Sequence, residues 1–314
     1  MTQGVLDRPI GELKFAVLDI ETTGLSPGQD RIVELAVVRV DPGEQPKQVL
    51  ESLVSPGRNV AGTEIHGVTD ADVAGAPTFA DLASDFLMAI SGCVVATYNV
   101  CFDLEFLTYE LGRVGVTGVP PYLCLMNMQP LLGLGDKCAL GAACERFGIP
   151  FAARHHAAEN AWVAAQLLQR YLERMQKDGV TTFGQLRQKK SFKFLDSLAA
   201  DPPEWNFVAG NVKPKRRALK PQSLQQPQQS PAMYWDALTA AVSDLQITPE
   251  EVTKLAELRR KLNLPDGHTR MFHARLFAAV LRQFLDDQRV DDKEAGKLRR
   301  LAECLRQLGW APGD

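Results

Sequence analysis

The 314-residue sequence has no apolar run that approaches the roughly 20 residues needed for a membrane-spanning helix. Its N-terminal stretch has neither the basic lead nor the apolar core of a secretory signal peptide. The six cysteines are scattered and include no Cys-x2-Cys pair, so a structural zinc site is not expected. Together these absences predict a cytoplasmic protein with reduced thiols.

The sequence also lacks an excess of basic residues, because 35 Lys and Arg residues are set against 38 Asp and Glu residues. A protein that attracts nucleic acid through its overall charge carries a broad basic surface. Any binding of nucleic acid must therefore depend on a local site and on bound metal. The length is sufficient for two domains, and the hydrophobic content of 45% is ordinary for a globular protein.

The most informative feature that is present is the acidic pair in Asp19-Ile20-Glu21. The apolar residues 15–18 predict a buried strand, and side chains two positions apart on a strand share one face. Adjacent carboxylates repel each other unless a cation lies between them, and hard oxygen ligands suit Mg²⁺ or Mn²⁺. Taken alone, the pair is also compatible with a solvated strand end.

Three further segments follow in a set order. Residues 64–69 read Glu-Ile-His-Gly-Val-Thr, residues 98–103 read Tyr-Asn-Val-Cys-Phe-Asp, and residues 155–161 read His-His-Ala-Ala-Glu-Asn-Ala. With the acidic pair, this order resembles the DEDDh 3′→5′ exonucleases, especially the proofreading epsilon subunits of bacterial DNA polymerase III. The resemblance covers residues 13–178. A single Asp-x-Glu motif is weak, whereas four motifs in the family's order and spacing are specific.

The resemblance implies a metal site and a reaction. Asp19 would bridge two Mg²⁺ or Mn²⁺ ions, whose coordination would be completed by Glu21, Asp103 and the residue at position 160. His155 would be the general base that takes a proton from the attacking water, because imidazole exchanges protons near neutral pH. The expected product is a nucleoside 5′-monophosphate released from a free 3′ end.

One position departs from the family's pattern. The third motif of the family is His-x4-Asp, and counting from His155 places Asn160 where the aspartate is expected. Because Asn160 is nearly isosteric with aspartate but neutral, we expect weaker metal binding and a lower rate. Glu159 does not replace the missing carboxylate, since adjacent helical positions point about 100° apart. The chain is either a natural degenerate copy or a deliberately inactivated Asp→Asn variant, and the otherwise intact motifs favour the second hypothesis.

A further set of residues is expected to contact the terminal nucleotide. These residues are Thr22, Thr23, Gly24, Leu25, His66, Asn99 and Phe102. In this interpretation Thr22 and Thr23 frame the nucleotide with backbone N–H groups, and Leu25 wedges against the last base.

Several of these residues also have a purely structural interpretation. For His66 a structural role and a nucleotide contact are equally expected, Asn99 suits a helix cap, and Phe102 suits the core better than a stacking surface. His156, next to the expected base, is predicted to be a surface residue.

The fold class implied by the resemblance is α/β, with a ribonuclease-H-like mixed five-stranded sheet flanked by helices, plus a separate small all-α domain. Residues 14–20, 31–40 and 48–55 predict an antiparallel meander, and residues 79–90 and 157–177 predict helices. The expected segments are an N-terminal tail at 1–12, the exonuclease-like domain at 13–178, an extension with a basic, Gln- and Pro-rich linker at 179–233, and a helical domain at 234–312.

The expected helical domain contains an internal repeat, which predicts two similar helical units. The apolar residues Ile247, Leu255, Leu258 and Leu262 recur in the same spacing as Val290, Leu298, Leu301 and Leu305. Thr248-Pro249 followed by Glu251 is typical of a helix start. The region resembles TerB-like (tellurite-resistance-type) domains, and binding of a protein partner, sensing and dimerisation are all compatible with it.

The sequence thus predicts a metal-dependent 3′→5′ exonuclease that acts on single-stranded or frayed DNA, in repair or proofreading. Two alternatives remain. One is an exoribonuclease, because the family contains ribonucleases. The other is a catalytically inactive module that binds 3′ ends or recruits a partner, with Asn160 as the natural residue. The basic residues between 213 and 220 are expected to form a solvated tether rather than a nucleic-acid contact.

Overall fold

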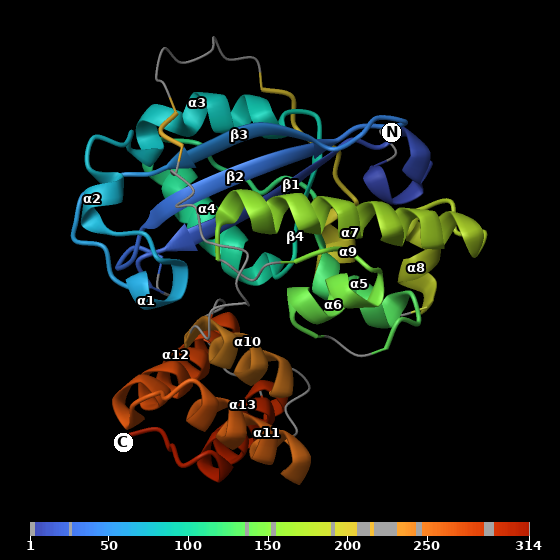
Figure 1. Ribbon diagram of the computed structural model, residues 1–314. Helices are drawn as coiled ribbons and strands as arrows, with labels where there is room; N and C mark the ends of the chain where they lie inside the picture. Colours follow the sequence, from blue (N-terminus) through green and yellow to red (C-terminus); the bar gives the residue numbers. More distant parts are fainter. Residues whose placement is uncertain are drawn as a thin grey trace. The chain divides into compact units, whose positions relative to one another are not determined.

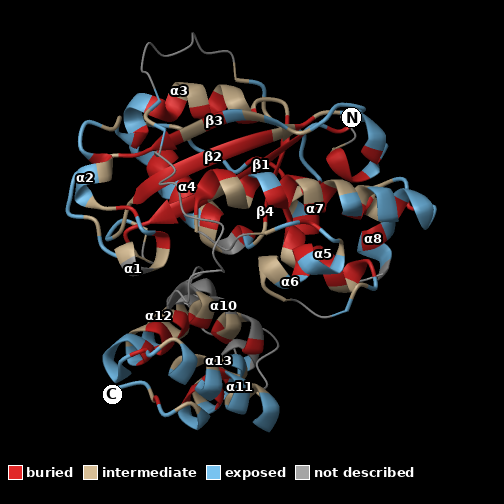
Figure 2. Ribbon diagram, in the orientation of Figure 1, coloured by how far each residue is buried: buried red, intermediate tan, exposed pale blue. Residues whose placement is uncertain are grey.

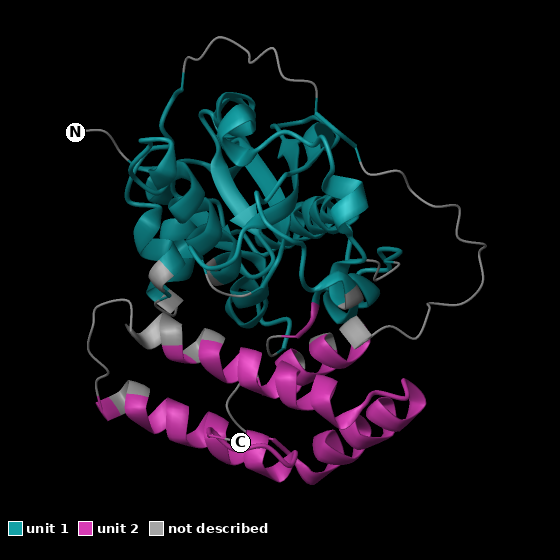
Figure 3. Ribbon diagram, turned by 90° about the vertical axis from the view of Figure 1, so that its left-hand side faces the viewer, with its two compact units in different colours: residues 1–136, 140–222 teal, residues 137–139, 223–314 magenta. Residues whose placement is uncertain are grey.

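The computed structural model divides the chain into two compact units, one of residues 1–136 and 140–222, the other of residues 137–139 and 223–314 (Figure 3). It describes residues 4–24, 27–135, 138–151, 155–189, 192–205, 214–216, 231–242, 247–285 and 292–313. Within these ranges, no helix is both long enough and apolar enough to cross a bilayer.

The first unit is built on a mixed five-stranded sheet with the strand order β3-β2-β1-β4-β5. The strands are β1 (Phe15–Thr22), β2 (Ile32–Val40), β3 (Lys47–Leu53), β4 (Val94–Thr97) and β5 (Tyr122–Cys124). Strands β1, β2 and β3 form the antiparallel meander that the sequence predicted, whereas β4 and β5 join the sheet in parallel. The ribonuclease-H-like fold class is confirmed.

Helices flank this sheet (Figure 1). They are α1 (Thr63–His66), α2 (Asp70–Val73), α3 (Phe79–Ile90), α4 (Val100–Arg113), α5 (Leu125–Leu131), α6 (Leu140–Arg146), α7 (Ala157–Lys177), α8 (Phe183–Lys189) and α9 (Lys193–Ser197), with short 3₁₀ turns at Val5–Asp7 and Ile10–Glu12. The start of α3 is fixed by a capping box in which Thr78 and Asp81 satisfy each other's backbone N–H groups. The predicted helices at residues 79–90 and 157–177 are confirmed.

The two faces of β1 have different surroundings because side chains alternate along a strand. Ala16, Leu18 and Ile20 belong to the buried core that includes residues of α3 and α4. Asp19 and Glu21 therefore point to the opposite face, which α7 crosses (Figure 1). Figure 2 shows that β1, β2 and the sheet-facing side of α7 are largely buried. The acidic pair is thus placed between strand β1 and helix α7.

Segments that follow α9 return to the sheet of the first unit. The backbone N–H of Trp205 donates to Ser91 Oγ at 2.7 Å. The backbone N–H of Leu53, in the edge strand β3, donates to the carbonyl of Lys215 at 2.8 Å. Lys215 Nζ also donates to the carbonyl oxygen of Ala74 at 2.5 Å. The prediction of a solvated tether is therefore wrong for Lys215, because its backbone pairs with an edge strand that offers unpaired N–H and C=O groups.

The described part of the second unit is helical. Its helices are α10 (Pro231–Ala241), α11 (Pro249–Lys261), α12 (Asp266–Leu285) and α13 (Asp292–Gln307). The predicted start of α11 is confirmed, since Thr248 and Glu251 form a capping box there. Leu255, Leu301 and Leu305 of the repeat are buried, whereas Val290 lies outside the described residues. The resemblance to TerB-like domains stays a prediction.

Candidate active site

The acidic residues meet at one end of the sheet. Asp19 and Glu21 lie in the last half of β1, and Glu21 is directly opposite Glu34 of β2. Asp103 is in the first turn of α4, which begins shortly after β4 ends. Because β1 and β4 are parallel, their carboxyl ends lie at the same edge, and this brings Asp103 next to the acidic pair.

Asn160 reaches the same place from the first turn of α7. Its Nδ2 donates to Asp19 Oδ2 at 3.2 Å. Its Oδ1 is buried and has no hydrogen-bond partner among the described residues. Glu21, Asp103 and Asn160 therefore all act on the Asp19 carboxylate, and Asn160 does so through its amide N–H group.

The surroundings of the carboxylates raise their pKa values. Burial is the main reason that the pKa of Asp19 lies well above its ordinary value, and the neighbouring charges of Glu21 and Asp103 add to the rise. The hydrogen bond from Asn160 opposes this rise. Burial likewise raises the pKa of Asp103 from 3.8 to about 7, although polar groups around it, first among them the Thr97 side chain, lower it in part. The charged forms are therefore disfavoured unless a cation compensates them.

The side chains of these residues have the donor atoms that a divalent cation prefers, although they are not arranged around one. Among the described residues, no group of three or more His, Cys, Asp and Glu side chains is arranged as a metal site. The donors are nevertheless all oxygens, which suits Mg²⁺ or Mn²⁺. The unpartnered Oδ1 of Asn160 supplies a further oxygen once the amide turns away from Asp19. We conclude that the chemistry of the donor set fits the expected ions.

Replacing Asp103 by asparagine is expected to stabilise the metal-free protein at pH 8. The pKa of Asp103 is about 7 in the folded protein and ordinarily 3.8, so the folded protein binds this proton more tightly than the unfolded chain. Stability is therefore lost as the pH rises from about 4 to about 7. In EDTA, Asp103→Asn should raise the melting temperature by roughly 3–8 °C at pH 8 and by clearly less at pH 5. An equal gain at both pH values, or a loss at pH 8, would contradict the assigned cause.

The two histidines at the start of α7 have different surroundings. His155 is half-buried and lies in the loop that enters the helix, as the sequence predicted. Its φ of 45° lies in the left-handed region, which is uncommon for residues other than glycine and tends to mark functional sites. The prediction that His156 is a surface residue is wrong. It is the N-cap residue of α7 and is 3% exposed, and its Nε2 lies 3.5 Å from Glu34 Oε1.

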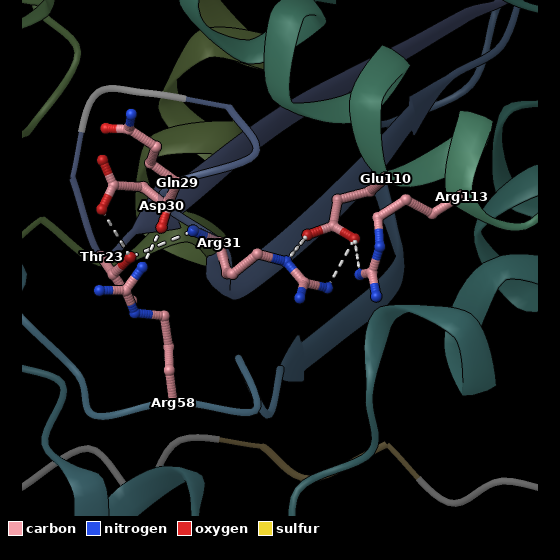
Figure 4. Close-up of polar contacts among 7 residues, drawn as sticks. All are labelled: Thr23, Gln29, Asp30, Arg31, Arg58, Glu110 and Arg113. Atoms are coloured by element: carbon pink, nitrogen blue, oxygen red, sulfur yellow. Dashed lines mark hydrogen bonds and ion pairs between the residues drawn. The ribbon is translucent and has the colours of Figure 1, made fainter.

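The turn that follows Glu21 is held by the start of β2 (Figure 4). Thr23 N–H donates to the carbonyl of Arg31 at 2.9 Å, and Arg31 N–H donates to Thr23 Oγ1 at 3.1 Å. The Thr23 hydroxyl donates to Asp30 Oδ1 at 3.2 Å. A Cβ atom at Gly24 would come within 2.4–2.6 Å of the Asp30 carboxyl group, so a larger residue there would require the Asp30 side chain to move. The Thr23 amide is thus committed within the protein, while Thr22 Oγ1 donates to the carbonyl of Gly24 at 2.5 Å.

A charge network centred on the buried Glu110 continues from this turn to α4 (Figure 4). The Glu110 side chain is 2% exposed and accepts hydrogen bonds from Arg31 Nε at 2.5 Å and Nη2 at 2.9 Å. Arg113 Nη1 donates to the same carboxylate at 3.1 Å. The network joins the turn after Glu21 to the helix that carries Asp103, and the sequence analysis missed it.

The position of His66 favours the structural interpretation. Its ring is 2% exposed, and Nδ1 accepts a hydrogen bond from the backbone N–H of Val68 at 3.0 Å. Its Nε2 lies 3.2 Å from the carbonyl oxygen of Ala61. Because Nδ1 serves the turn after α1 and Nε2 lies against the segment before α1, His66 orders the backbone on both sides of this short helix.

Asn99 and Phe102 lie at the start of α4. Asn99 is exposed and occupies the N-cap position that the sequence predicted, but its side chain makes no capping hydrogen bond. Phe102 is half-buried, and its ring centroid is 5.2 Å from that of Phe106. Phe102 therefore packs at the edge of the core, and Leu25 lies outside the described residues.

The sequence profile of the family described as "Exonuclease" (RNase_T) matches residues 16–168, the part of the chain that contains this site. This segment belongs to the exonuclease family. The exonuclease domain is 37% identical over 185 residues to the DNA polymerase III subunit epsilon-like protein of Rhodobacter capsulatus, a match that covers 57% of this chain and 26% of the relative. The domain is therefore related to DNA polymerase III epsilon-like proteins.

Another relative matches over a longer part of the chain. The PolC-type DNA polymerase III of Thermotoga maritima is 29% identical over 219 residues, which are 68% of this chain and 16% of that protein. The chain thus spans about a quarter or less of the length of these two relatives. Among solved structures, Exonuclease X in complex with 5′ overhanging duplex DNA is 26% identical, with a TM-score of 0.40 over 55% of this chain and 98% of that chain.

Proposed function

We propose that the exonuclease domain is a metal-dependent 3′→5′ exonuclease that releases nucleoside 5′-monophosphates from single-stranded or frayed DNA. The observation that carries this proposal is the convergence of Asp19, Glu21, Asp103 and Asn160 at one end of the sheet, directly beneath the start of α7. DNA is proposed as the substrate because both relatives are named as DNA polymerase III proteins. A role in proofreading or repair fits the same relatives.

Each of these side chains would have its own role in the reaction. Asp19, Glu21, Asp103 and residue 160 would hold two Mg²⁺ or Mn²⁺ ions, which when bound stabilise charge on the scissile phosphate and activate water. His155 would take the proton from the attacking water at a ring nitrogen. The turn of residues 22–24, fixed by its hydrogen bonds to the start of β2, would set the position of the terminal nucleotide.

Asn160 is proposed to weaken this activity. Its N–H group donates to Asp19 and lowers the pKa of that carboxylate. The amide thus stabilises the negative charge of Asp19 in part, as a bound cation would. Binding of metal has to break this hydrogen bond, and the site gains no fourth negative charge in return. The otherwise complete site favours an introduced Asp→Asn substitution over a natural one, and an aspartate codon at this position in the native gene would bear this out.

The same hydrogen bond supports a second candidate function. Because the Asn160 amide stabilises Asp19 without metal, the domain is also suited to holding 3′ ends without cleaving them. In that case Asn160 is the natural residue, and the second unit would recruit a protein partner.

A polarity assay tests the proposed function. The Asn160→Asp protein is incubated with Mn²⁺ and a 5′-labelled single-stranded DNA, or with RNA of the same sequence. We expect a ladder of DNA products shortened one nucleotide at a time from the 3′ end. His155→Ala in the same background should slow the ladder by about 10²–10⁴-fold without loss of DNA binding. Internal cuts, or shortening from the 5′ end, would contradict the proposal, and faster degradation of RNA would favour the exoribonuclease.

A further inference from the structure

A buried glutamate that the proposed mechanism does not use lies beside the site. Glu34 is near the start of β2, is 0% exposed, and is opposite Glu21 in the antiparallel ladder. Its charge also contributes to raising the pKa of Asp19. A buried carboxylate next to other carboxylates is unfavourable unless polar groups compensate it. The position of Glu34 therefore needs an explanation.

Two groups at the N-terminus of α7 face the Glu34 carboxylate. Glu34 Oε2 accepts a hydrogen bond from the backbone N–H of Ala157 at 3.2 Å. Glu34 Oε1 lies 3.5 Å from Nε2 of His156, and both side chains are almost fully buried. The first N–H groups of a helix have no partner within the helix and attract negative charge. Glu34 of β2 therefore contacts both His156 and Ala157 and holds the start of α7 against the sheet.

His156 and Ala157 lie between His155 and Asn160, the two residues near the start of α7 that the proposed site uses. His155 precedes His156 directly and holds a left-handed backbone conformation with φ of 45°. Asn160 follows in the first turn, where its backbone N–H donates to the carbonyl of His156 at 2.9 Å. A shift of His156 would therefore move both the proposed base and residue 160 relative to Asp19.

We propose that Glu34 and His156 are positioning residues that hold the start of α7, and with it His155 and residue 160, in register with the acidic residues of β1. The inference rests on the proposed exonuclease function. Neither residue touches the reacting atoms, so both act on the rate of the chemical step rather than on binding of DNA. A displacement of catalytic groups by about 1 Å is enough to lower a rate by about 100-fold.

The test is a double-mutant cycle in the Asn160→Asp protein at saturating Mn²⁺, with a single-stranded DNA substrate. Glu34→Ala and His156→Ala should each lower kcat by roughly 10–100-fold and change KM by less than about threefold. The double variant should be no slower than the slower single variant, because the two residues act as one unit. Glu34→Gln and His156→Gln, which keep an acceptor and a donor at these places, should regain most of the rate.

Val38→Ala is the matched control for lost stability. Val38 is also buried in β2, on the same face as Glu34, but it is opposite Val17 rather than Glu21. It should lower the melting temperature and leave kcat within about twofold. Additive losses in the double variant, a change in KM alone, or equal losses in Val38→Ala would overturn the proposal and leave Glu34 with a structural role only.

Hydrogen–deuterium exchange of a peptide that spans residues 155–160 separates this inference from the proposed function. The alanine variants at positions 34 and 156 should speed exchange there at least tenfold relative to Val38→Ala, whether or not the parent cuts DNA. If the parent is inactive, the proposed function fails and this exchange still decides whether the pair holds α7. Unchanged exchange overturns the positioning role directly.

Discussion

Replacing Asn160 by aspartate is expected to raise the rate of nucleotide release by about a hundredfold or more. The change removes the hydrogen bond that the Asn160 amide donates to Asp19 and adds a carboxylate that strengthens metal binding. With asparagine at position 160 the proposed metal site lacks one of its charged partners, and the loss of a charged partner in a buried site typically costs about 2–5 kcal/mol. Each 1.36 kcal/mol is a factor of about ten in rate. Initial rates over a series of Mg²⁺ and Mn²⁺ concentrations measure the effect.

The metal series also separates binding from turnover. In the Asn160→Asp protein the half-saturating metal concentration should fall at least about tenfold, because a fourth carboxylate attracts the ions. Asn263→Asp is the matched control, since it makes the same chemical change after α11 in the second unit. It should leave both the rate and the metal dependence unchanged. Equal activity of the Asn160→Asp protein and its parent at every metal concentration would contradict the role assigned to this position.

Asp19→Asn in the Asn160→Asp protein is expected to lower the rate by about a thousandfold or more. Asp19 is central to the site, since Glu21, Asp103 and Asn160 all act on its carboxylate. Metal ions stabilise the charge of a phosphoryl transition state by several kcal/mol, and this stabilisation is lost when the ions are not held. A loss of about 4 kcal/mol corresponds to roughly a thousandfold in rate.

The stability of the same variant shows whether this loss is catalytic. Burial and neighbouring acids raise the pKa of Asp19, so its charge destabilises the metal-free fold at neutral pH. Asp19→Asn should therefore melt at a temperature equal to or above that of its parent in EDTA. Asp41→Asn, which lies past the opposite end of β2 and pairs with Arg39, is the control and should retain full activity. A rate loss together with a lower melting temperature would point to misfolding instead.

Much of the exonuclease domain could be predicted from the sequence because its signals are local. The alternation of apolar and acidic residues in 15–22 placed Asp19 and Glu21 on one face, and the structure agrees. The helix at residues 157–177 was also predicted with its observed bounds, since its apolar positions recur at helical spacing. By contrast, the pairing of Lys215 with the edge strand β3 could not be predicted, because a Pro- and Lys-rich segment carries no strand pattern.

The residues around the metal positions were harder to predict because they depend on contacts between distant segments. Glu34 left one usable signal, since it is the single acidic residue of a strand that is largely buried and apolar apart from Arg39. Glu110 left none, because a glutamate on an amphipathic helix is ordinarily solvated. His156 was assigned to the surface from its residue type, whereas it is buried at the start of α7, next to Glu34 of a distant segment.

The most direct test of the central claim follows a 3′-labelled single-stranded DNA in Mn²⁺ with three proteins. These are the chain with Asn160, its Asn160→Asp form, and the Asn160→Asp form that also carries Asp19→Asn. We expect rapid release of labelled nucleoside 5′-monophosphate by the Asn160→Asp protein. Release should be at least about a hundredfold slower with the Asn160 protein and at least about a thousandfold slower with the double variant. Binding of the 3′ end by all three proteins with no release by any of them would contradict this expectation, and would assign the domain to the binding of 3′ ends.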